Sequence, residues 1–173
     1  MNRFLPFLET GDLRSIARAN QAAERVQNQA DFDELMACLS DGRRLVVMRA
    51  ADAVEKVTRM QPHYLQPHRK TLLALRNTAT DKELIWHLAQ LLPRLKLTGK
   101  ERQQTWQALH GWAINRAQSR IVRVNALQGL TDLALQYPAF RPELHLLFGF
   151  LEQERVPSLS ARIRKLRTAL AHA

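Results

Sequence analysis

The chain has 173 residues, 46% of them hydrophobic, so it is long enough to bury a core and too apolar to be disordered. Its 26 Lys and Arg against 16 Asp and Glu give a net charge of +10, which favours nucleic acid, an acidic protein or an anionic membrane surface as partner. The single cysteine, Cys38, excludes a disulfide within the chain, and we expect a buried thiol. No apolar run is long enough for a signal peptide or a membrane span, which predicts a cytoplasmic protein with no membrane span.

Helix-forming residues dominate the chain and no stretch alternates as a strand would, so the predicted fold class is all-α. Residues 1–30 are expected to hold an N-terminal capping helix that starts at Asp12. Pairs of helices follow, separated by polar elbows and joined by linkers with Pro or Gly; Thr80 and Ser158 are expected to cap two second helices. The first helices are predicted at about 31–39, 67–77, 100–114 and 139–152, and the second at about 43–60, 80–95, 118–136 and 157–171.

The helix pairs repeat with a period of 37 residues. At this spacing a leucine opens each of four matching segments, at Leu35, Leu72, Leu109 and Leu146. A unit of this length cannot bury its apolar face alone, so neighbouring units must stack and the ends must be capped. A second column of the repeat is also apolar, with Met48, Ile85, Val122 and Leu159.

The first unit resembles a HEAT repeat, in which an acid in the turn is followed by a Val-Arg pair and an Ala-rich second helix. Asp41 matches the turn acid and Met48-Arg49 the pair. The third unit is similar, with Asn115 and Val122-Arg123 at these places. The other two units depart from the pattern: the second has Thr78 and Ile85-Trp86, and the fourth has Glu152 and Leu159-Ser160.

The resemblance covers residues 31–171. It implies a right-handed α-solenoid of antiparallel helix pairs, with three to four repeats after the capping helix, so that residues 1–173 form a single HEAT-like domain. It also implies that the second helices line one concave surface.

Cations on the second helices give the main functional signal. No acid occurs between Glu101 and Asp132, although Arg102, Arg116, Arg120 and Arg123 fall there. Trp86 takes the place of an arginine in the repeat, where an aromatic ring could anchor a partner. The alternative is that these cations only solvate their helices. The predicted partner-binding residues are Arg49, Lys56, Arg59, Trp86, Arg94, Arg120, Arg123, Arg162 and Lys165.

No catalytic, metal or cofactor motif is present. The segment "LTGKER" (97–102) lacks the first glycine of a phosphate loop, and Gly99 is expected to end a helix instead. We therefore predict a non-enzymatic interaction scaffold, without cofactor, whose basic concave surface binds an acidic protein segment or other anionic partner.

The alternative function is nucleic-acid binding. The HEAT-like alkylpurine DNA glycosylases also use helical repeats, a positive concave face and aromatic residues. This chain is short for that family and has no Asp beside a Trp where its catalytic acid is expected. A third possibility is a HEAT-like lyase or hydroxylase subunit, for which the sequence offers no ligands.

Overall fold

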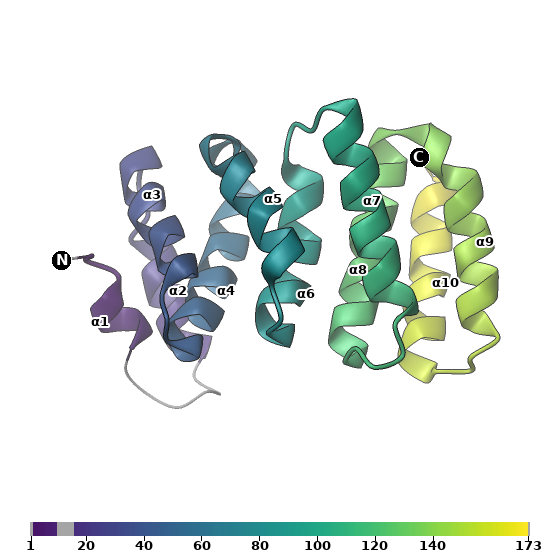
Figure 1. Cartoon of the computed structure of the whole chain (residues 1–173), viewed down its shortest axis with the longest axis horizontal. Helices are drawn as coiled ribbons and strands as arrows, with labels where there is room; N and C mark the ends of the chain where they lie inside the picture. Colours follow the sequence, from purple (N-terminus) through teal and green to yellow (C-terminus); the bar gives the residue numbers. More distant parts are fainter. Residues whose placement is uncertain (1, 10–15, 173) are drawn as a thin grey trace. The chain divides into compact units, whose positions relative to one another are not determined.

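The computed structural model describes residues 2–9 and 16–172, which form α-helices and short 3-10 helices and no strand (Figure 1). The fold is therefore all-α, as predicted. No helix in this described part combines the length and the apolar character needed to cross a membrane. The chain divides into two compact units, residues 1–72 with 94–96 and residues 73–93 with 97–173. The boundary between the two units falls inside α5 (Arg69–Thr78). A single repeat domain over the whole chain stays a prediction.

The first unit is built around α4 (Arg44–Met60). Its apolar side chains recur every three or four residues, so Val46, Ala50 and Val54 form one fully buried stripe. Burying an aliphatic side chain of this kind contributes about 1.5–3 kcal/mol. The helices that pack on α4 are α1 (Leu5–Leu8), α2 (Ile16–Glu24) and α3 (Gln29–Ala37).

The second unit is built around α8 (Arg120–Gln136). The helices α6 (Lys82–Leu91), α8 and α10 (Pro157–Ala171) each follow a polar elbow and lie side by side (Figure 1). The helices α7 (Gly99–Ile114) and α9 (Arg141–Glu152) lie in front of α8 and α10. Gly129 lets α8 approach α6 closely, because a Cβ atom there would lie 2.4 Å from the carbonyl oxygen of Ala89. The helices that pack on α8 are α6, α7, α9 and α10.

Short 3-10 turns with proline follow three of the helices. They are η2 (Pro62–His68), η3 (Leu92–Arg94) and η4 (Pro138–Phe140). Two of them lie in predicted linkers, whereas η3 lies inside the helix predicted at about 80–95. A fourth turn, η1 (Cys38–Ser40), lies in the elbow between α3 and α4. The predicted helices are confirmed, with ends that differ from the expected ones by a few residues.

Three predicted helix ends are wrong. Gly99 begins α7 instead of ending a helix, because the side chain of Thr98 accepts from Glu101 N while the Glu101 carboxylate accepts from Thr98 N. This reciprocal pair satisfies the free N–H groups of the first turn. The N-cap residues of α6 and α10 are Asp81 and Val156 rather than the expected Thr80 and Ser158. The expected cap at Asp12 lies outside the described residues.

Candidate anion-binding site

Two of the predicted partner-binding arginines are buried. Arg49 is 2% exposed and its Nη1 donates to Leu8 O at 3.0 Å. Arg123 is 4% exposed; its Nε donates to Ala113 O at 2.8 Å and its Nη2 to the Glu154 carboxylate at 3.0 Å. The expectation that both face a partner is therefore wrong. Each arginine lies beside the buried stripe of its helix, so its stem packs inside and its guanidinium binds groups within the unit.

Arg94 and Arg59 bind one buried carboxylate in the first unit. Glu55 accepts from Arg94 Nη2 at 2.6 Å and from Arg59 Nη2 at 2.6 Å. Arg94 also donates to Thr58 Oγ1 at 2.7 Å. Arg94 therefore joins its segment to α4, whereas the ion pair of Arg59 with Glu55 lies within α4.

Two more predicted residues are engaged on the surface of their unit. Lys56 Nζ donates to Asp52 at 2.7 Å and to Asn20 at 2.6 Å. Arg162 Nη1 donates to Gln128 Oε1 at 3.0 Å, which joins α10 to α8. These contacts anchor neighbouring helices and leave the two cations only half exposed.

Three predicted residues remain. Trp86 is half buried, with its ring stacked on the His87 ring at a centroid distance of 3.6 Å. Lys165 is exposed on α10 and Arg120 is exposed at the start of α8. Of the nine predicted residues, Arg120 and Arg123 are brought together in one pocket.

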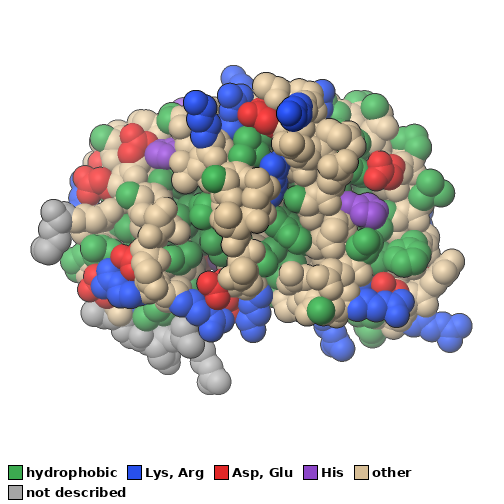
Figure 2. Space-filling view, in the orientation of Figure 1, with side chains coloured by type: hydrophobic (Ala, Val, Ile, Leu, Met, Phe, Trp, Pro, Cys, Tyr) green, Lys and Arg blue, Asp and Glu red, His purple; other side chains and the backbone are tan. Residues whose placement is uncertain are grey.

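This pocket, which we call the elbow pocket, has a volume of about 620 Å³ in the second unit. It lies between the α7–α8 elbow and the α9–α10 elbow, at the lower edge of these helices in Figure 1. Figure 2 shows Lys and Arg side chains along the same edge. The lining residues are Arg116, Gln118, Ser119, Arg120, Arg123, Gln153, Glu154 and Val156.

The start of α8 forms one wall of the elbow pocket. Ser119 caps the helix, and its Oγ accepts from Val122 N at 3.4 Å. Arg120 is the first residue of the helix, and Arg116 comes from the elbow just before it. The N-terminus of a helix carries a partial positive charge, which adds to the charge of the two exposed guanidiniums.

Glu154 is the acid among the lining residues, and its carboxylate is engaged by arginine. It accepts from the buried Arg123, and its Oε1 lies 3.5 Å from Arg116 Nε. One carboxylate against three guanidiniums leaves two positive charges in excess. The lining contains no His or Cys, so the pocket offers donors and charge for binding an anion but no evident general base.

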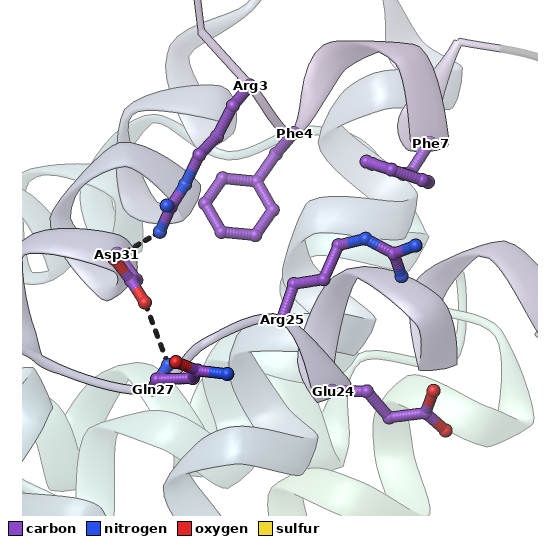
Figure 3. A pocket seen from close by; sticks show the side chains of 7 residues that line it. All are labelled: Arg3, Phe4, Phe7, Glu24, Arg25, Gln27 and Asp31. Carbon is purple, nitrogen blue, oxygen red and sulfur yellow. Dashed lines mark hydrogen bonds and ion pairs between the residues drawn. The ribbon is translucent and has the colours of Figure 1, made fainter.

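A second pocket, of about 400 Å³ in the first unit, carries no excess charge (Figure 3). Asp31 forms an ion pair with Arg3 and accepts from Gln27 N at 2.9 Å, while the Arg25 guanidinium lies over the Phe7 ring at 4.0 Å. Its charged groups are thus matched within the pocket, so that of these two pockets the elbow pocket is the better candidate for an anion. The lining residues are Arg3, Phe4, Phe7, Glu24, Arg25, Gln27 and Asp31.

Sequence reasoning missed Arg116 as a site residue. It belongs to a polar elbow, whereas the predicted partner-binding residues were placed on the second helices. The signal that could have found it is the acid-free stretch between Glu101 and Asp132, in which Arg116 and Arg120 both fall.

Comparison of the chain with protein-family models, with curated proteins and with solved structures gives no match. Within the described residues, no three His, Cys, Asp or Glu side chains come together in an arrangement that could hold a metal ion.

Proposed function

We propose that the protein is a non-enzymatic binding module that holds an acidic protein segment at the elbow pocket of its second unit. One observation carries this proposal: Arg116 and Arg120 are exposed in one pocket whose acid, Glu154, is shared between Arg116 and the buried Arg123, so that one carboxylate faces three guanidiniums. Two guanidiniums in a pocket can each bind a carboxylate through paired hydrogen bonds.

The supply of accessible cations favours an acidic peptide over nucleic acid. Six of the nine predicted partner-binding residues donate to groups within their own units. A nucleic acid is held by a track of cations along its phosphates, and the excess at the elbow pocket is two charges in one place. A relationship to the DNA glycosylases therefore has less support than the peptide-binding function.

The same proposal includes a HEAT-like relationship of the helix pairs, with the right-handed stacking that it implies and a cytoplasmic location. Its support is the 37-residue period and the equivalence of Arg49 and Arg123, which lie two periods apart. Each of these arginines is buried and donates to a carbonyl at the end of an earlier helix, Leu8 O in α1 or Ala113 O in α7.

The test of the binding function is a titration with a labelled oligoglutamate peptide followed by fluorescence anisotropy. We expect Arg116→Glu/Arg120→Glu to weaken binding by at least about tenfold, because both charges that face the peptide are reversed. The matched control is Arg164→Glu/Lys165→Glu, which makes the same change of charge on exposed residues of α10 outside the pocket.

Equal weakening by both double variants would show attraction to the overall charge alone and would overturn the elbow pocket as the site. The protein could instead bind duplex DNA more tightly than the peptide and lose that binding when salt is added or in Arg116→Glu/Arg120→Glu. This result would make a nucleic acid the partner in place of an acidic protein.

A further inference from the structure

The outer face of α9 carries an exposed apolar pair. Leu146 is 77% exposed and Phe150 is 52% exposed. Because they are four residues apart, about one helical turn, both side chains lie on the same face of α9. The core of the unit is formed by the opposite face of α9, where Leu144, Leu147 and Leu151 are buried. Folding of the unit therefore makes little use of Leu146 and Phe150, and exposed apolar groups of this kind mark interaction surfaces.

A glycine lies between the two apolar side chains. A Cβ atom at Gly149 would meet no atom within 4 Å, so no close contact in the unit requires a glycine at this position. Gly129 differs, since a Cβ atom there would collide with α6. Because glycine disfavours a helix, its presence at 149 needs another reason. Gly149 places no side chain beside Leu146 and Phe150, so a side chain of a partner can approach the backbone of α9 there.

The exposed face of α9 leads into the elbow pocket. Pro142, Leu146, Phe150 and Gln153 are exposed at spacings of three or four residues, and Gln153 lines the pocket. Figure 2 shows hydrophobic side chains over α9 and Lys and Arg side chains at the edge below them. The apolar pair and the basic pocket are thus neighbouring parts of one surface of the second unit.

We infer that the segment bound by this protein is an amphipathic acidic helix whose apolar residues pack on Leu146 and Phe150 while its acidic end reaches Arg116 and Arg120. This inference rests on the proposed function and adds an apolar requirement to it. A helical segment would present its anchors at positions i and i+4, matching the spacing of the pair on α9.

Charge complementarity favours this occupant over a second copy of the chain. The second unit has 13 Lys and Arg against 7 Asp and Glu, a net charge of +6. Two copies that met at α9 would each bring a net charge of +6 to the contact, whereas an acidic helix meets this surface with opposite charge.

The test compares two labelled peptides of equal charge with the full-length protein. One is an acidic amphipathic helix with leucines at i and i+4, and the other has serines in place of these leucines. We expect wild type to bind the leucine peptide at least about tenfold more tightly. Leu146→Ser/Phe150→Ser should weaken the leucine peptide until both peptides bind equally, and should leave the affinity for the serine peptide unchanged. The variant should still fold, since both side chains are exposed.

Two further variants refine the test. Gly149→Leu adds a side chain beside Leu146 and Phe150 and should weaken the leucine peptide selectively, whereas Gly111→Leu, at another helical glycine with open space around it, should not. Arg116→Glu/Arg120→Glu should weaken both peptides.

An unchanged ratio in Leu146→Ser/Phe150→Ser would overturn the amphipathic partner while leaving acidic binding intact. If Arg116→Glu/Arg120→Glu changed the affinity for neither peptide, the proposed function itself would be overturned. A wild-type dimer that this serine variant converts to a monomer, with no change in peptide binding, would assign the apolar pair to a second copy.

Discussion

Glu55 is a buried carboxylate that binds two arginines of different exposure. The Arg94 side chain is 22% exposed and that of Arg59 is 60% exposed. We predict that Arg94→Met lowers the free energy of unfolding by about 3 kcal/mol, because it leaves a buried charge short of its partner. The control Arg59→Met removes a solvent-exposed partner and should cost about 0–1 kcal/mol. Urea denaturation measures both, and equal losses would show that burial of Arg94 does not matter.

The acidic groups of the first unit predict how its stability depends on pH. Burial opposes ionisation of Glu55, but Arg59 and Arg94 outweigh it and hold its pKa below the ordinary 4.5. Hydrogen bonds from Arg43 lower the pKa of Asp41 to about 2. A carboxylate whose pKa is lower in the folded state stabilises that state fully above its unfolded pKa, and this stability is lost as the pH falls through the folded pKa.

We therefore expect the free energy of unfolding to be level near neutral pH and to fall as the pH drops below about 4.5 towards 2. Urea midpoints across this range measure it. Glu55→Gln should make the fall shallower, and a free energy of unfolding that rises on acidification would contradict the assignment.

Cys38 is buried, as the sequence predicted, and burial raises the pKa of its thiol to about 11. Only the thiolate reacts with disulfide reagents. We predict that an aromatic disulfide reagent at about pH 8 modifies Cys38 slowly in native buffer and rapidly once urea opens the first unit. Complete labelling within the mixing time in native buffer would disprove a closed first unit.

At the scale of elements, the contact of α6 with α8 depends on one glycine. A methyl group at Gly129 would collide with Ala89 O, so Gly129→Ala should destabilise the second unit by about 1–3 kcal/mol despite the better helix propensity of alanine. Gly111 in α7 has open space around it, and Gly111→Ala should stabilise the unit by about 0.5–1 kcal/mol. Thermal unfolding separates the two signs, and a stabilising Gly129→Ala would refute the close approach.

Periodicity predicted the existence of the helices well, because an apolar side chain every three or four residues is specific to a helix with one buried face. Helix ends were predicted less well. Whether Gly99 ends one helix or begins the next depends on the hydrogen bonds between Thr98 and Glu101, which sequence spacing alone allows but does not require.

The candidate site was only partly predictable. The repeat places Arg49 and Arg123 two periods apart, but it could not show that both are buried, because their partners are distant in sequence. Leu8 lies 41 residues from Arg49, and Glu154 lies 31 residues from Arg123. The exposed cation at Arg120 was predicted, whereas the pocket around it needs two elbows from different helix pairs.

At the scale of the whole molecule, the net charge of +10 does not describe a single binding surface. Much of the positive charge is engaged in bonds that hold helices together, and the accessible excess that we assign to a partner lies at the elbow pocket. The overall charge would still speed the approach of an acidic partner, so association should slow as salt is added.

The central claim is that an acidic segment binds at the elbow pocket. Titration of ¹⁵N-labelled protein with the oligoglutamate peptide, followed by amide chemical shifts, tests it most directly. We predict that the largest shifts occur at residues 116–120 and 153–156, and that Arg116→Glu/Arg120→Glu abolishes them. Shifts that are largest around Arg164 and Lys165 on α10, with the elbow amides unmoved, would contradict the account.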